Sequence, residues 1–155
     1  MIAAALLPLT LGAAACQPQE QQPRLERSAA GLMQVPLTIT GASGKMHRFT
    51  VEVAATPAEQ AQGLMNRETL GPDQGMIFPF EQPRDASFWM KNTLIPLDMI
   101  FIRTDGTIAR IEPNTVPLSL EPVLSLEPVA AVLELAGGRS AELGIEAGDR
   151  VSWPR

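Results

Sequence analysis

Cysteine and histidine each occur only once in the 155 residues, and tyrosine is absent. A lone thiol cannot form an internal disulfide, and Cys16 with His47 is too small a ligand set for zinc. Zinc hydrolysis, thiol–disulfide exchange and a Ser-His-Asp triad are therefore poorly supported. The methionines form no Met-x-x-Met cluster for copper(I), so their spacing favours core filling. We expect no metal and no other cofactor.

Basic residues are also scarce, with 12 Lys and Arg against 17 Asp and Glu and a formal net charge of −5. Nucleic acids and anionic membrane surfaces bind proteins through a basic footprint, so neither is an expected partner. The chain does have 45% hydrophobic residues, 14 prolines and 12 glycines. This composition allows one domain with a real core, and the frequent turn-formers indicate many short strands rather than a helical bundle.

The N-terminal segment 2–15 carries no charge, is almost wholly apolar, and ends in Ala13-Ala14-Ala15 directly before Cys16. A short apolar run followed by small residues is typical of an export signal, and small residues before a cysteine resemble a bacterial lipoprotein cleavage site. In that interpretation Cys16 is lipidated, and ordinary cleavage after Ala15 is the alternative. The run is short for a bilayer span, and Pro8 interrupts it.

Three regions follow from this pattern. Residues 1–16 are predicted to be the export signal, 17–34 a Gln/Pro-rich tether, and 35–155 a single β-rich domain. The protein is then periplasmic, as a membrane-anchored lipoprotein that meets the membrane only through its N-terminal signal or lipid. We expect it to be a monomer.

Alternating apolar and polar residues predict short strands throughout the domain. The predicted strands cover residues 37–40, 45–54, 75–80, 86–90, 97–103, 107–111, 129–135 and 150–153. Thr56, Pro57 and Glu59 form a capping box that starts a helix, and 139–143 predicts one short helical turn. Ser-Leu-Glu-Pro-Val at 119–123 recurs at 125–129, and its prolines indicate an irregular loop before the next strand. We therefore predict a mainly β (α+β) fold, a compact small β-barrel of antiparallel strands with one or two short helices.

Several motifs follow one another along this domain. They are Gly63-Leu64-Met65-Asn66-Arg67, Gly75-Met76-Ile77-Phe78, Phe88-Trp89-Met90-Lys91-Asn92-Thr93, Ile95-Pro96-Leu97-Asp98, Val132-Leu133-Glu134-Leu135-Ala136-Gly137 and Gly148-Asp149-Arg150-Val151. On these motifs the chain resembles the bacterial and archaeal family called domain of unknown function 192. The resemblance implies a compact β-rich barrel in proteins that are often exported, and it brings no established activity.

The segment 87–98 sets polar side chains among large apolar residues, and unpaired polar groups are costly in a core. These polar residues are Lys91, Asn92, Thr93 and Asp98. Either they line a pocket or they tie a strand end to its loop. Asn92 and Thr93 are equally suited to shaping the turn after the strand. Asp98 alternates with apolar neighbours and should face opposite to them, either outward or into a barrel mouth.

The sequence leaves two interpretations of Trp89 open. Tryptophan flanked by Phe and Met is more often a core residue, but its flat ring is also a stacking platform for a sugar or heterocycle. If Phe88 and Met90 are buried, alternation places Trp89 and Lys91 together on the opposite face. That arrangement is the one a binding site requires.

Charged side chains complete the candidate site. Arg67 follows the predicted helix and either caps its C-terminus or clamps an anionic ligand. Lys91 either anchors an anion or pairs with Asp98 or Glu134, and Glu134 is the natural partner of Arg67 or Lys91. The full set of predicted ligand-binding residues is Arg67, Trp89, Lys91, Asn92, Thr93, Asp98 and Glu134.

Three functions remain open at this point. The leading hypothesis is a non-catalytic module of the cell envelope that binds an anionic or polyhydroxylated small molecule. The second is an enzyme with Asp98 or Glu134 as acid or base and Lys91 as electrostatic stabiliser, but no nucleophile–base pair is recognisable and no catalytic residue is assigned. The third is an interaction or assembly factor that pairs with an envelope protein through an exposed sheet edge near 78–80.

Overall fold

The structure, a computed structural model, describes residues 26–154. The predicted export signal, its Cys16 and the first half of the predicted tether lie outside the described residues. The last part of that tether has local structure, because Arg27 and Met33 form an isolated antiparallel bridge just before the first strand. Neither helix in the described part of the chain is long and apolar enough to cross a membrane.

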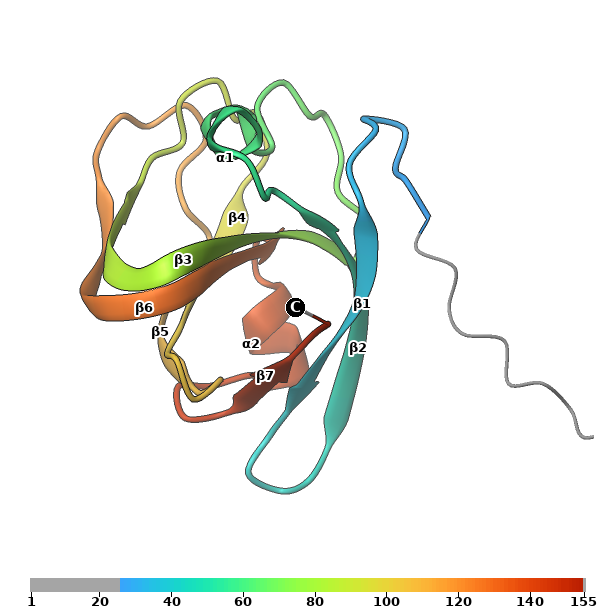
Figure 1. Cartoon of the computed structure of the whole chain (residues 1–155), viewed down its shortest axis with the longest axis vertical. Coiled ribbons are helices and arrows are strands. Elements are labelled where there is room, and N and C mark those ends of the chain that lie inside the picture. The colour runs from blue at the N-terminus through green and yellow to red at the C-terminus, as the bar shows by residue number, and fades with distance from the viewer. Residues whose placement is uncertain (1–25, 155) are drawn as a thin grey trace, which may run out of the picture.

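Seven strands and two short helices make up the fold (Figure 1). The elements are β1 Gln34–Thr40, β2 Met46–Val53, α1 Pro57–Gln62, β3 Gln74–Phe88, β4 Leu97–Ile102, β5 Ile108–Glu112, β6 Val123–Ala136, α2 Arg139–Leu143 and β7 Arg150–Ser152. The strands form one sheet in the order β5-β4-β6-β3-β2-β1-β7. A bridge between Thr107 and Arg150 brings the two ends of this order together, so the sheet is a nearly closed barrel. The predicted mainly β barrel is confirmed.

One strand pair departs from the antiparallel expectation. β2 and β3 are parallel, with Val51 opposite Gly75, whereas every other neighbouring pair is antiparallel. Parallel neighbours need a long crossover connection, and here α1 with the loop after it provides one. The barrel is therefore mixed, and α1 is placed above the curved ribbon of β3 and β6 (Figure 1).

The start of α1 is as the sequence predicts. The Thr56 hydroxyl accepts a hydrogen bond from the Glu59 amide at 3.2 Å, and the Glu59 carboxylate accepts one from the Thr56 amide at 2.8 Å. The bond from the Thr56 amide is the main reason that the pKa of Glu59 lies below its ordinary value. The helix ends at Gly63, which has φ +47°, so the crossover turns sharply after fewer than two turns of helix.

Two predicted boundaries are wrong, and both involve the β3–β6 ribbon. The strands predicted at 75–80 and 86–90 are one strand, β3, with a register shift after Pro79. The second repeat copy lies inside β6 rather than in a loop. There the Ser125 hydroxyl accepts from the Ala86 amide at 2.8 Å and donates to the Glu127 carbonyl at 2.7 Å, which satisfies backbone groups where the proline-rich ladder is irregular.

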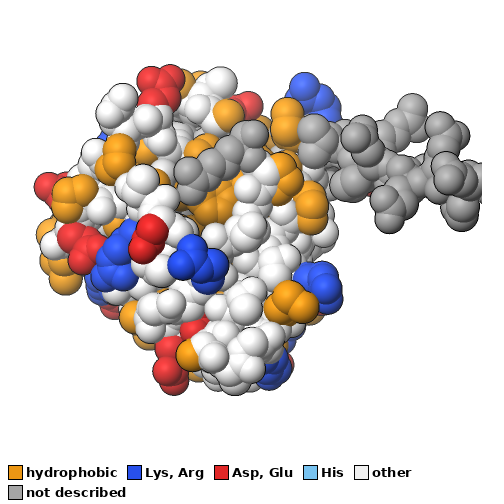
Figure 2. All heavy atoms as spheres, turned by 60° about the horizontal axis from the view of Figure 1, so that its bottom comes forward, with side chains coloured by type: hydrophobic (Ala, Val, Ile, Leu, Met, Phe, Trp, Pro, Cys, Tyr) orange, Lys and Arg blue, Asp and Glu red, His pale blue; other side chains and the backbone are white. Residues whose placement is uncertain are grey.

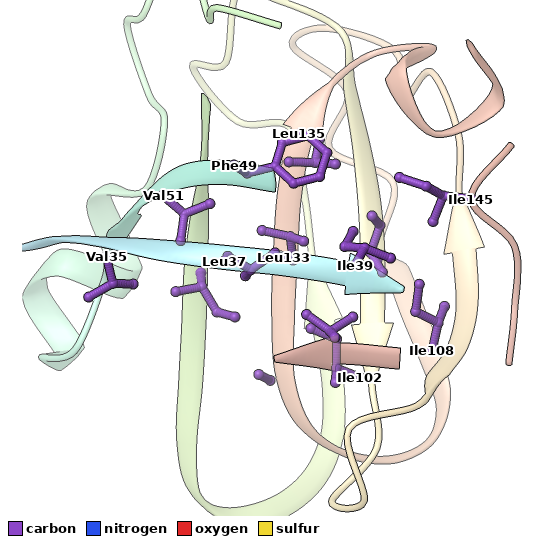
Figure 3. Close-up of a cluster of buried hydrophobic side chains, with 14 residues drawn as sticks. Val35, Leu37, Ile39, Phe49, Val51, Ile102, Ile108, Leu133, Leu135 and Ile145 are labelled. Atoms are coloured by element: carbon purple, nitrogen blue, oxygen red, sulfur yellow. The ribbon is translucent and has the colours of Figure 1, made fainter. Parts of the chain in front are cut away.

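Two apolar clusters fill the molecule. The first is the barrel interior, shown in Figure 3, where side chains such as Leu37, Ile102 and Leu133 converge from β1, β4 and β6. The second lies on the opposite face of β3, β4 and β6 and includes Met76 and Met99. Because side chains alternate along a strand, these three strands are buried on both faces. The second cluster is the one that carries the candidate site.

The short helical turn predicted at 139–143 is confirmed as α2, and a tight turn follows it. Gly144 ends α2 at φ +69° and Gly148 adopts φ +96° in the next turn. The Asp149 carboxylate accepts a hydrogen bond from the Glu146 amide at 3.0 Å, which holds this turn together. Outside, the face seen in Figure 2 mixes acidic, basic and apolar side chains, and no one charge sign dominates it.

Candidate functional site

A pocket of about 270 Å³ opens on the second apolar face, between α1, the loop after it and the β3–β6 ribbon. Its lining residues are Gln60, Ala61, Gly63, Leu64, Met65, Phe78, Arg84, Ser87, Phe88, Trp89, Thr93 and Glu134. Three of the predicted site residues, namely Trp89, Thr93 and Glu134, are thus brought together. A concave site with apolar walls and a few polar groups is the usual form of a small-molecule site.

Aromatic rings form much of its wall. Phe78 and Phe88 meet edge to face with ring centroids 5.1 Å apart. Trp89 is 51% exposed, so its core reading is wrong and its ring is available to a ligand. The Lys91 ammonium lies 5.1 Å from the centroid of that ring. The predicted alternation is confirmed, since Met90 is buried while Trp89 and Lys91 share the outer side.

Glu134 is the polar group inside the pocket. It is only 4% exposed, and within residues 26–154 its carboxyl makes no hydrogen bond and no ion pair. Burial raises its pKa from the ordinary 4.5 to about 8. The predicted pairing of Glu134 with Arg67 or Lys91 is wrong, because both cations lie elsewhere. Near neutral pH the carboxyl is therefore mostly a neutral acid, able to donate and to accept.

Arg67 is an internal ion-pair partner. Its guanidinium donates to the Glu52 carboxylate at 2.6 Å, and Glu52 is 4% exposed. The second Glu52 oxygen, Oε1, is buried without a hydrogen-bond partner. Arg67 neither caps α1 through its side chain nor lines the pocket, so the structure places it outside the site.

Asn92 and Thr93 shape the turn after β3. Asn92 has φ +55°, and its carbonyl accepts from the Asn66 amide at 2.8 Å, which ties this turn to the loop after α1. The Thr93 hydroxyl donates to the Lys91 carbonyl at 3.3 Å and the residue is buried against the pocket. Both residues therefore hold the wall in place, and Thr93 also lines it.

Asp98 lies away from the pocket. It is completely buried, and its carboxylate accepts three backbone N–H groups, from Asn114 at 2.9 Å, Gly138 at 2.8 Å and Ser140 at 2.7 Å. The expected orientation opposite to Leu97 is confirmed, but an outward position or one at an open mouth is wrong. Asp98 fastens the start of α2 and the loop after β5 to the barrel, which is an architectural role.

Other lining residues were missed by the sequence reasoning. Gln60 lies on α1, and its amide donates to the carbonyls of Ala54 at 3.2 Å and Pro79 at 2.9 Å. Arg84 lies at the pocket edge with its guanidinium carbon 4.1 Å from the centroid of Phe80. The one signal available was the resemblance motif at 63–67, which begins three residues after Gln60.

The sheet edge near 78–80 is partly covered, because the Gln60 side chain donates to the Pro79 carbonyl and Phe78 is buried.

A second hollow of about 440 Å³ lies beside the loop between β5 and β6. Arg110 borders it and donates to the Glu112 carboxylate and to the Leu124 carbonyl. Leu124 and Leu126 on its rim are 46% and 77% exposed. This hollow is larger, but none of its described lining residues is a buried carboxyl, so the pocket around Glu134 is the better candidate.

The fold and the pocket define a class, namely small nearly closed β-barrels with an aromatic pocket on the outer face of the sheet. The chain belongs to the family domain of unknown function 192, described as "Uncharacterized ACR", whose model matches residues 38–153. The resemblance of the sequence motifs to this family is thereby confirmed. A comparison with functionally curated proteins found no match.

Two solved structures are similar to this chain. A protein of unknown function from Novosphingobium aromaticivorans DSM 12444 is 45% identical, with a TM-score of 0.80 over 92% of this chain and 100% of that one. A protein from Sinorhizobium meliloti 1021, provisionally described as a transcription regulator, is 46% identical, with a TM-score of 0.77 over 79% of this chain and 95% of that one. Both structures share the fold of this chain. The Novosphingobium protein has no functional description.

Proposed function

We propose that this protein is a non-catalytic binding module of the cell envelope whose pocket takes a polyhydroxylated small molecule. The observation that supports this is the half-exposed Trp89 ring at a pocket that holds the buried, unpartnered carboxyl of Glu134. A sugar ring presents an apolar face to an aromatic ring and hydroxyls to a polar group. Stacking on Trp89 with a hydrogen bond to Glu134 uses both features at once.

Of the two ligand classes expected from the sequence, the polyhydroxylated one has the better support. Arg67 is already bonded to Glu52, so it is not free to clamp an anion. The polar group inside the pocket is an acid, and a carboxyl gives an anionic ligand no attractive charge. Lys91 remains beside Trp89, where it can donate to a hydroxyl of the bound ligand.

The proposed location and partners rest on the sequence. The apolar segment 2–15 and the small residues before Cys16 support export to the periplasm and lipidation there. The net charge of −5 speaks against nucleic acid as the partner. The description of the Sinorhizobium protein as a regulator is therefore not carried over to this chain.

A thermal-shift screen of the chain against neutral sugars tests the proposal. We expect at least one sugar to stabilise the wild type and the shift to disappear in Trp89→Ala, because stacking on one ring contributes about tenfold in affinity. Since Trp89 is half exposed, the free variant should unfold within about 0.5–1 kcal/mol of the wild type. Leu120→Ala, another exposed apolar truncation away from the pocket, is the matched control and should leave the shift unchanged.

The opposite pattern would count against the site. If Trp89→Ala lowers only the stability of the free protein and sugars shift both proteins equally, Trp89 is a structural residue and the proposal fails.

An enzymatic role is the second candidate, and the raised pKa of Glu134 favours it. A carboxyl that is still protonated near neutral pH is suited to act as a general acid. Asp98 cannot share this role, since it is buried elsewhere and holds three backbone amides. Incubation with sugars and their esters, followed by mass spectrometry, separates the two functions. Product formed by the wild type and not by Glu134→Gln would establish catalysis, whereas intact ligand supports binding alone.

A further inference from the structure

Glu134 is the middle member of a row of glutamates that crosses the second apolar face. The strand register places Glu52 opposite Met76, Met76 opposite Glu134, Glu134 opposite Met99, and Met99 opposite Glu112. Directly opposed residues point to the same face of a sheet. The three carboxyl groups therefore lie on one face, separated by methionines.

The two outer members of this row each have an arginine, and the middle one does not. Arg67 bonds to Glu52 and Arg110 bonds to Glu112. Glu134 is as buried as Glu52, yet no cation of residues 26–154 reaches it. Glu134 therefore lacks the arginine partner that Glu52 and Glu112 each have.

The groups that face Glu134 cannot replace that charge. The strands on either side present Met76 and Met99, and the only other charged residue among the described lining residues is Arg84. Arg84 lies over the Phe80 ring and makes no ion pair with Glu134. Two neutral donors of the wall are used elsewhere, Gln60 on two carbonyls and Thr93 on one.

The rest of the pocket is suited to a cation. Phe78, Phe88 and Trp89 line it, and aromatic faces attract ammonium groups, more strongly where water is excluded. The Trp89 ring already has the Lys91 ammonium above it. A buried carboxyl in a pocket lined by aromatic rings is therefore suited to bind a ligand amine.

We propose that the polyhydroxylated ligand carries a basic amine, so that the pocket recognises an amino sugar whose ammonium group bonds to Glu134. This inference rests on the proposed function, because it names the chemical class of ligand for the same pocket. On binding, the neutral carboxyl gives its proton to the solvent, and the carboxylate that forms accepts an N–H of the ammonium. The ligand amine stays protonated throughout, and no covalent bond within the ligand changes.

Calorimetric titration of the full chain with glucosamine, glucose and N-acetylglucosamine at pH 7 tests this. The three probes share a ring, but only glucosamine carries an ammonium. We expect glucosamine to bind roughly tenfold more tightly than the other two, because a charged hydrogen bond contributes more than a neutral one. Proton release, measured in buffers of different ionisation enthalpy, should accompany glucosamine binding alone.

Variants of the glutamate row make the test specific. Glu134→Gln keeps the size and hydrogen bonding of the side chain, so it should bind glucosamine only as well as glucose and should lose the proton release. Glu112→Gln, at the end of the same row and outside the pocket, is the matched control and should behave as the wild type.

Each outcome is decisive. Equal binding of glucose and glucosamine by the wild type would overturn the amine proposal and leave the sugar-binding function standing. Binding of neither sugar would overturn both. A preference for glucosamine that survives in Glu134→Gln would show that another group recognises the amine.

Discussion

Replacing Glu134 by glutamine is expected to change how the stability of the protein depends on pH. Burial raises the pKa of Glu134 from 4.5 to about 8, so in this interval the folded chain binds a proton that the unfolded chain has released. Stability falls with rising pH wherever the folded state binds more protons. The free energy of unfolding of the wild type should therefore decrease from pH 4.5 to 8 through this group and then level off.

The size of the effect follows from the same two values. A pKa difference between 4.5 and 8 corresponds to roughly 5 kcal/mol, most of which develops before the carboxyl ionises in the folded state. Glu134→Gln cannot ionise, so it avoids this loss. The variant should gain about 4 kcal/mol relative to the wild type between pH 5 and pH 9, and about 2–3 kcal/mol of that gain should appear by pH 7.

Urea unfolding of both proteins at several pH values from 5 to 9 measures this difference directly. Taking the difference cancels the titration of groups that both proteins share, such as Asp105, whose pKa is lowered by hydrogen bonds from Thr107. Glu112→Gln, which removes a carboxyl bonded to Arg110, controls for the loss of one negative charge. A difference between wild type and Glu134→Gln that stays constant across this range would refute the argument, because Glu134 would then not be a buried, protonated acid.

Two further predictions concern residues that hold the barrel together. Asp98→Ala would leave the N–H groups of Asn114, Gly138 and Ser140 unpaired in a buried site, so urea unfolding should show a loss of about 3–5 kcal/mol, and a loss under 1 kcal/mol would contradict the architectural role. Gly75→Ala would place a methyl group 2.6 Å from the Glu134 carbonyl oxygen, so it should cost at least 1–3 kcal/mol in the same assay. Gly144→Ala is a comparison for Gly75→Ala without the clash, since nothing lies within 4 Å there and only the strained φ of +69° opposes it.

Much of the fold could be predicted because its signals are local. The capping box at Thr56 and Glu59 specifies the start of α1 through bonds within four residues. Alternating apolar residues located β1, β2, β4 and β5 to within a few residues. The parallel pairing of β2 with β3 and the full lengths of β3 and β6 were not predicted, because they depend on which distant strand each segment meets.

For the candidate site, too, the sequence predicted what depends on neighbouring residues and missed what depends on distant ones. Alternation along one segment was enough to place Trp89 and Lys91 on the same side of the strand, but the structure was needed to show that this side is exposed. The partners of the charged residues could not be read from the sequence, since Arg67 pairs with Glu52 across the crossover and Asp98 with amides up to 42 residues away. The Glu52 side chain on β2 and backbone amides after β5 and at the start of α2 make these contacts, and they come together only once the barrel has formed.

The sequence by itself determined the class of fold, the start of both helices and the shared side of Trp89 and Lys91, because each depends on residues within a few positions of one another. The tertiary structure decided which carboxyl is paired and which is not. Glu52 and Glu134 are equally buried and lie on the same face of the barrel. They differ only in that the loop after α1 brings Arg67 to Glu52 and leaves Glu134 facing a pocket, and that difference is set by contacts between strands far apart in the chain.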